Sequence, residues 1–422
     1  MTDLIKKFNY GARWNAFESI FYKAILATHQ TCLFYFASRL VYGFSSLLFA
    51  IIYLTVDLIN LGLDHSVAQL SGNYLESRPN FKYYLVPQLI AQIFILFLLL
   101  FTVATNYVQL NQKLLPDAAY LHLNQWLLLA VIIMCESIHK SLRLFAQLLF
   151  LNKPASILAS SLILIYVGLF WGMVLVGYPI DLYTIYLPLL IQSLIGITGL
   201  LILIIPKFKL RLNHKKLSDY QTTKLNWIII FYARAQNYLY HLSEILFSSN
   251  FLIYLFSAIS GLITIGPIKL ANYLAVFLKA LLERTFGLTS LAIFAQNKNL
   301  IKEQKRLFEF AQRKLNFTLV FLFTVFGACT LLTGILHQSS YLALLFFGFT
   351  LINNFLIIYE QLFLIYNKIL FLFILNLVGI AGFLLFLNLN PQASIAQLII
   401  LLAIFRIATL LAVKLVTKNL LK

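Results

Sequence analysis

The chain has 422 residues, of which 61% are hydrophobic and only 11% are charged, and its mean hydropathy is +0.87. About one-quarter of the residues of a soluble domain are charged, so this composition excludes water as the solvent for most of the surface. The formal net charge of +18 would suggest nucleic-acid binding in a soluble protein. Here the charges follow the pattern of a membrane protein, so no nucleic-acid partner is needed.

Apolar stretches long enough to cross a bilayer, which takes about 20 residues, recur along the whole chain. The polar segments between them are too short to fold as soluble domains. The sequence therefore predicts an all-α polytopic membrane protein. In chain order, the predicted spans are 18–40, 42–63, 83–105, 120–149, 154–177, 182–205, 226–256, 260–292, 315–337, 340–366, 368–388 and 393–415.

The distribution of Lys and Arg predicts the orientation of the chain. With these twelve spans, most of the 32 Lys and Arg residues, including Lys140 and Arg143, fall on the side of the N-terminus. The loops on the opposite side hold only Arg39 and Lys113. Positive charge accumulates on the cytoplasmic side of membrane proteins, so we predict a multi-pass protein of a bacterial inner membrane with both termini in the cytoplasm. The basic excess also attracts the anionic lipids of the bilayer.

Two halves of similar organisation are predicted on either side of a basic central segment. The sequence RWNAFESIFYKA at 13–24 is weakly similar to NWIIIFYARA at 226–235. Each segment introduces a long apolar stretch that carries a histidine. We therefore predict two six-helix bundles, at 1–206 and 226–422, joined by a cytoplasmic linker at 207–225. Repeats of this kind place a substrate site between the halves near the middle of the membrane.

Several charged residues lie at membrane depth in the seventh and eighth predicted spans. Arg234, His241 and Glu244 are spaced by seven and three residues, which places them on one helical face. The eighth span carries a further group of ionisable residues, namely Lys269, Lys279, Glu283 and Arg284. A charge at the centre of a lone helix costs about 2.5–3.5 kcal/mol, so each of these groups needs a partner or water.

These charges have two interpretations. They pair with one another as structural groups, or they line a wet basic cavity together with His29 of the first span. A basic cavity favours an anionic ligand such as a phosphate or diphosphate. Asp57 and Glu244 are candidates to carry coupling protons or sodium ions, although pairing would explain them equally well.

Sequence motifs of enzymes and cofactor sites are absent. The chain has no G-x-x-x-x-G-K-[ST], H-E-x-x-H, C-x-x-C or G-x-S-x-G. The predicted external loops are short and contain almost no Asp or Glu, which a membrane glycosyltransferase would need. We therefore predict a protein that moves a substrate, with no enzymatic activity and no cofactor.

The segment FASRLVYGFSSLLFAIIYLTVDLINLGLDHSVA at 36–68 resembles the opening helices of polysaccharide and O-antigen flippases. These belong to the multidrug/oligosaccharidyl-lipid/polysaccharide (MOP) exporter superfamily. The similarity lies in the Tyr42-Gly43 turn and in the Gly62-Leu63 pair at the end of the second span. The second half repeats the pattern with IGPIKLANYLA at 265–275.

The resemblance implies two bundles forming a V-shaped alternating-access transporter, with a cavity lined chiefly by helices 1, 2, 7 and 8. The implied cargo is an undecaprenyl-diphosphate-linked oligosaccharide, moved from the cytoplasmic to the periplasmic leaflet. Other membrane proteins of glycan assembly are its expected partners. Cationic side chains are expected to hold the diphosphate, and they correspond here to Arg39, Arg234, Lys269, Lys279 and Arg284.

Three alternatives remain open from the sequence. A drug/cation antiporter or a peptidoglycan-precursor flippase would belong to the same superfamily. A membrane glycan polymerase or ligase would use the same class of lipid-linked sugars. The candidate site residues His29 and His241 do not discriminate among these functions.

Overall fold

The computed structural model describes residues 2–60, 81–115, 120–149, 151–212, 227–245, 247–260, 269, 281–288, 290, 294, 301–332, 338–366 and 368–420. Lys279 lies outside the described residues, and so does the side chain of Arg284. In the described ranges the chain is helical, and no strand occurs.

The first half of the chain forms six long helices. They are α1 (Thr2–Phe36), α2 (Arg39–Ile59), α4 (Phe81–Leu114), α5 (Leu123–Leu148), α6 (Asn152–Leu175) and α7 (Leu182–Leu212). The second half contains α8 (Trp227–Ile245), α9 (Ser249–Ser260), the π-helical turn η2 (Glu283–Leu288), α12 (Ile301–Leu332), α13 (Gln338–Ile365), α14 (Ile369–Leu389) and α15 (Ile395–Leu420).

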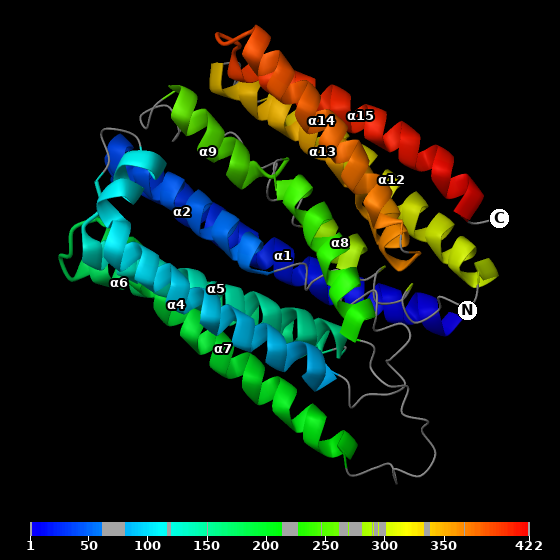
Figure 1. Ribbon diagram of the computed structural model, residues 1–422, viewed down its shortest axis with the longest axis horizontal. Coiled ribbons are helices and arrows are strands. Elements are labelled where there is room, and N and C mark those ends of the chain that lie inside the picture. The colour runs from blue at the N-terminus through cyan, green and yellow to red at the C-terminus, as the bar shows by residue number, and fades with distance from the viewer. Residues whose placement is uncertain are drawn as a thin grey trace.

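Seven of the described helices are long and apolar enough to cross a membrane. The predicted fold class, an all-α polytopic membrane protein in two bundles, is confirmed. The two bundles lie side by side with α8 and α9 between them, and the N- and C-terminal ends of the chain lie at the same end of the molecule (Figure 1).

The first bundle is held by an apolar core and by hydrogen bonds between helices. Tyr42 and Phe170 are fully buried in this core. The hydroxyl of Tyr186 on α7 donates to the carbonyl oxygen of Ser45 on α2 at 2.8 Å. A buried hydroxyl needs such a partner because the membrane interior offers no water.

The second bundle packs α13 and α14 against α15. Its core includes the fully buried rings of Phe256 and Phe346. Close packing is possible at Gly382, where an added Cβ would lie 2.5 Å from the ring of Phe405. The small residue therefore lets α14 and α15 approach each other, as is common between membrane helices.

The predicted span 226–256 is divided into two helices, and each of them contacts both bundles. α8 ends at Ile245, and α9 begins at Ser249. The Ser248 side chain caps α9 by accepting a hydrogen bond from the Phe251 amide at 3.2 Å. α8 packs against α14 of the second bundle and also contacts α2 of the first. α9 packs against α2 and contributes Ile253 to the core of the first bundle, and it contributes Phe256 to the core of the second. The two helices therefore connect the bundles.

Several helices extend beyond the predicted spans. α1 begins at Thr2 and α12 at Ile301, although their apolar stretches begin later. α7 continues past Pro206 to Leu212, into the segment predicted as a linker. Apolar composition indicates where a helix crosses the membrane, and it carries no information about where the helix begins in water.

Candidate functional site

A cavity of about 430 Å³ lies within the first bundle and reaches the second half of the chain. Its walls come from α1, α2, α5, α6, α7 and α9, together with Lys269. The lining residues are Tyr22, Lys23, Leu26, Gln30, Ser46, Phe49, Ala50, Tyr53, Val56, Asp57, Glu136, His139, Lys140, Arg143, Ala159, Leu162, Ile163, Tyr166, Leu189, Gln192, Asn250, Ile253 and Lys269.

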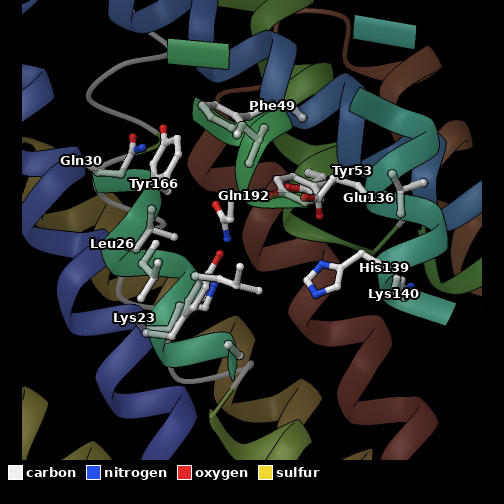
Figure 2. A pocket seen from close by; sticks show the side chains of 18 of the residues that line it. Lys23, Leu26, Gln30, Phe49, Tyr53, Glu136, His139, Lys140, Tyr166 and Gln192 are labelled. Carbon is white, nitrogen blue, oxygen red and sulfur yellow. The ribbon is translucent and has the colours of Figure 1, made fainter. Parts of the chain in front are cut away.

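Helical spacing brings these side chains to one space. On α5, four ionisable residues at intervals of three and four share a face: Glu136, His139, Lys140 and Arg143. Figure 2 shows two sides of the cavity, with Lys23, Leu26, Gln30 and Tyr166 on one and Tyr53, Glu136, His139 and Lys140 on the other, and Gln192 between them.

Two ion pairs tie α5 to the first two helices. Lys140 Nζ lies 2.8 Å from Asp57 Oδ1 on α2. Arg143 pairs with the buried carboxylate of Glu18 on α1, and this carboxylate also accepts a hydrogen bond from the Ser156 hydroxyl at 3.1 Å. In a medium of low polarity each charge needs a partner of opposite sign, so these pairs fix the relative positions of α1, α2 and α5.

Glu136 has a different environment from these paired acids. Its carboxylate accepts a hydrogen bond from the Ser193 hydroxyl on α7. Within the described part of the chain, no Lys, Arg or His lies within ion-pair distance of it. The phenol of Tyr53 lies close enough to interact electrostatically with it. The cavity thus contains one carboxylate that no cation of the described residues neutralises.

Lys269 is a cavity cation that, like Glu136, has no ion-pair partner among the described residues. It comes from the second half of the sequence and projects into a cavity built mainly by the first half. Its ammonium group lies 5.0 Å from the centre of the Phe49 ring, in a cation–π contact. No carboxylate of the described residues lies within ion-pair distance of this ammonium. An anionic ligand could supply that charge.

The cavity as a whole is suited to binding an anion with a polar body. It contains four basic side chains, at positions 23, 140, 143 and 269, against two acidic ones, at 57 and 136, and Arg143 also pairs with Glu18 outside the lining. The amides of Gln30 and Gln192 can bind hydroxyl groups. No group of three or more potential metal ligands occurs among the described residues.

The predicted site residues of the first half are distributed over three places. Asp57 lies in the cavity and pairs with Lys140. His29 is buried on another side of α1, edge-on to Tyr166 and Phe170, and does not line the cavity. Arg39 is exposed at the first residue of α2, outside the cavity lining.

The predicted site residues of the second half are also dispersed. Among those that the structure describes, Lys269 alone lines the cavity. Arg234 on α8 donates a hydrogen bond to the side chain of Gln88 on α4, which joins the two halves. Glu244 pairs with Arg406. His241 is half-buried on α8 and outside the cavity lining.

The contribution of α5, α6 and α7 to the cavity was not predicted from the sequence. Lys140 and Arg143 were interpreted as cytoplasmic charges, whereas the structure places them in the cavity wall. The signal that could have revealed them is the polar stripe that they form with Glu136 and His139 on one face of an apolar helix.

No protein-family model matches the chain, and no curated protein matches its sequence. Solved structures do match. The eukaryotic MATE transporter AtDTX14 aligns with a TM-score of 0.75 and 13% identity, over 99% of this chain and 96% of that one. The Vibrio cholerae MATE transporter VcmN aligns with a TM-score of 0.67 and 14% identity, over 100% of this chain and 97% of that one.

A third match is a MOP superfamily transporter from Pyrococcus furiosus, with a TM-score of 0.64 and 10% identity over 97% of this chain and 95% of that one. Its binding pocket is described as having reverse polarity, which suggests a different function for that protein. Identities of this size establish the fold and leave the substrate open. Over nearly its whole length, the chain has the fold of these MATE transporters.

Proposed function

We propose that this protein is a flippase that moves a polyprenyl-diphosphate-linked oligosaccharide from the cytoplasmic to the periplasmic leaflet of a bacterial inner membrane. The observation that carries the proposal is Lys269, a cation that faces the cavity and has no carboxylate partner among the described residues. A diphosphate would supply the missing negative charge.

The remaining cavity residues suit the sugars next to the diphosphate. Tyr22, Tyr53 and Tyr166 offer aromatic faces on which sugar rings can stack, and Gln30 and Gln192 offer amides for hydroxyl groups. A volume of about 430 Å³ accommodates a diphosphate with its first sugar. The rest of the oligosaccharide would extend between the lobes, and the polyprenyl chain would stay in the bilayer.

The fold supports a transport mechanism. Two lobes with a binding site at their interface can expose that site to one side of the membrane and then to the other. Lys269 comes from the second half while the opposing cavity walls come from the first half. A change in the angle between the lobes would therefore separate Lys269 from the first-half residues and weaken the binding of the diphosphate.

A second candidate function is export of an organic cation in exchange for protons. The observation that favours it is Glu136, a cavity carboxylate with no cationic partner among the described residues. A cationic drug would pair with this carboxylate, because opposite charges attract. The excess of basic side chains in the same cavity favours the anionic cargo.

The first test is lipid mass spectrometry on cells depleted of the protein. We expect a polyprenyl-diphosphate oligosaccharide to accumulate in the cytoplasmic leaflet. Complementation with Lys269→Gln should leave the lipid accumulated, whereas the matched control Lys302→Gln, on an exposed position of α12, should clear it.

Two other outcomes would replace the proposal. A rise in drug sensitivity without accumulation of any lipid-linked sugar would favour the cation exporter. Completed sugar units left unpolymerised in the periplasmic leaflet would indicate a polymerase or ligase.

A further inference from the structure

Glu136 and Lys269 face the same cavity, and each has no partner of opposite charge among the described residues. A bound anion interacts with the two groups in opposite ways. A diphosphate near Lys269 gains attraction, whereas the same diphosphate is repelled by an ionised Glu136. These charges interact more strongly than in bulk water, because the cavity lies between membrane helices, where the effective dielectric constant is lower.

The other groups around the cavity do not remove this repulsion. The titratable and charged side chains that share the wall with Glu136 are His139, Lys140 and Arg143 on α5, Tyr53 and Asp57 on α2, Tyr22 and Lys23 on α1, Tyr166 on α6, and Lys269. Cys135 is its neighbour on α5, outside the lining. Asp57 is neutralised by Lys140 and Glu18 by Arg143. Glu136 is thus the acid whose charge a bound anion meets directly.

From this arrangement we infer that Glu136 takes up a proton when the cavity binds a diphosphate headgroup. The inference rests on the proposed function. The proton comes from the buffered solvent, whose acid component gives it up, and it is held on a carboxylate oxygen, with no covalent bond formed or broken in the ligand. Protonation removes the repulsion, and the neutral carboxyl group becomes a hydrogen-bond donor that can bind a phosphate oxygen.

The sign of this linkage separates the two candidate functions. An anion and a proton promote each other's binding, because binding linkage is reciprocal. A cationic cargo would compete with the proton for Glu136 and would release it. Proton uptake therefore identifies an anionic cargo, and it means that the proton on Glu136 moves with the cargo in the same direction.

The test is isothermal titration calorimetry of the purified full chain with farnesyl diphosphate, in buffers of different ionisation enthalpy. The buffer dependence gives the number of protons bound with the ligand. We expect wild type to take up about one proton more per diphosphate than Glu136→Gln at neutral pH. The difference between the two proteins cancels the ionisation of the ligand itself.

The affinities provide a second readout. Glu136→Gln imitates the protonated acid, so it should bind farnesyl diphosphate about tenfold more tightly than wild type at neutral pH and about equally at acidic pH. The matched control Glu309→Gln, on an exposed position of α12, should behave like wild type. If Glu136→Gln does not fold, Ser193→Ala serves instead, because it removes the hydroxyl that stabilises the ionised carboxylate. It should shift proton uptake to higher pH.

The outcomes are distinguishable. Equal proton uptake by wild type and Glu136→Gln, with diphosphate bound by both, would overturn the linkage and leave the flippase proposal intact. Absence of diphosphate binding by wild type at every pH would overturn the flippase proposal. Binding of an organic cation with release of a proton would overturn both and establish the cation exporter.

Discussion

Arg406 on α15 binds both carboxylate oxygens of Glu244 on α8, with Nη2–oxygen distances of 2.9 and 2.8 Å. Asn376 on α14 joins the same carboxylate through its amide at 2.7 Å and accepts a hydrogen bond from Arg406 at 3.0 Å. The guanidinium also lies 4.0 Å from the centre of the Phe247 ring. One buried cation therefore contacts both α8 and the turn that follows it.

Removal of this cation should destabilise the second bundle. Arg406→Gln leaves the Glu244 carboxylate without a counter-charge, and breaking a buried pair in this way costs about 3–5 kcal/mol. Thermal unfolding of the purified protein in detergent should show a clear drop in melting temperature. Arg313→Gln, on an exposed position of α12, should change the free energy of unfolding by less than about 0.5 kcal/mol. Equal melting temperatures for the two variants would contradict a structural role for the pair.

A second prediction concerns the polar link between α4 and α5. The Gln92 amide donates to the hydroxyls of Ser137 and Ser141, at 2.8 Å in each case. Gln92→Leu should reduce the free energy of unfolding by about 0.6–1.7 kcal/mol, between the average and the largest value found for hydrogen bonds between membrane helices. Thr105→Val is the control on the same helix, because the Thr105 hydroxyl is exposed and bonds to carbonyls of its own helix. A Gln92→Leu protein as stable as this control would argue against the link.

The approach of α14 to α15 gives a third prediction. A Cβ at position 382 would lie 2.5 Å from the Phe405 ring, so Gly382→Ala should cost about 1–3 kcal/mol through overpacking. Gly172 on α6 has nothing within 4 Å of the corresponding position. Gly172→Ala should be neutral or stabilising by up to about 1 kcal/mol, because alanine favours the helix. Urea or thermal unfolding of the two variants measures this difference. An equal change in the free energy of unfolding for both variants would contradict overpacking at position 382.

A fourth prediction tests Asp57 as an ion-coupling residue. The Asp57 and Lys140 side chains are 25% and 35% exposed, so the pair contributes at most about 1 kcal/mol to stability. The swap Asp57→Lys with Lys140→Asp should restore the stability lost in each single variant. If Asp57 carries a coupling ion in addition to the proton on Glu136, transport stays defective in the swapped protein because the carboxylate has moved to another helix. Recovery of transport in the swapped protein would show that Asp57 serves only as the structural partner of Lys140.

The fold class could be predicted from the sequence because apolar length is a direct consequence of crossing a bilayer. Apolar length could not predict that the span 226–256 is divided after Ile245. Nothing in its composition distinguishes a continuous helix from two helices joined at Ser248. Arg406, which lies far away in the sequence, contacts both Glu244 at the end of α8 and Phe247 in the turn that follows it.

The candidate site was predicted only in part for a similar reason. Lys269 and Asp57 stand out as charges in apolar segments, and the structure places both in the cavity. Lys140 and Arg143 lie near the end of an apolar span, so the sequence favoured a topological role for them. Their position in the cavity depends on the packing of α5 against α1 and α2, which the pattern within one helix does not reveal.

The break between α8 and α9 has a kinetic consequence. Both helices contact both lobes, because α9 packs on α2 and places the Phe256 ring against Phe346, while α8 packs on α14 and bonds to Gln88 through Arg234. A change in a few backbone torsions at the turn before Ser249 lets α8 and α9 tilt separately when the angle between the lobes changes. We therefore expect the rate of exchange between inward- and outward-open forms to depend on how firmly Ser248 caps α9, and less on the area of apolar surface between the lobes.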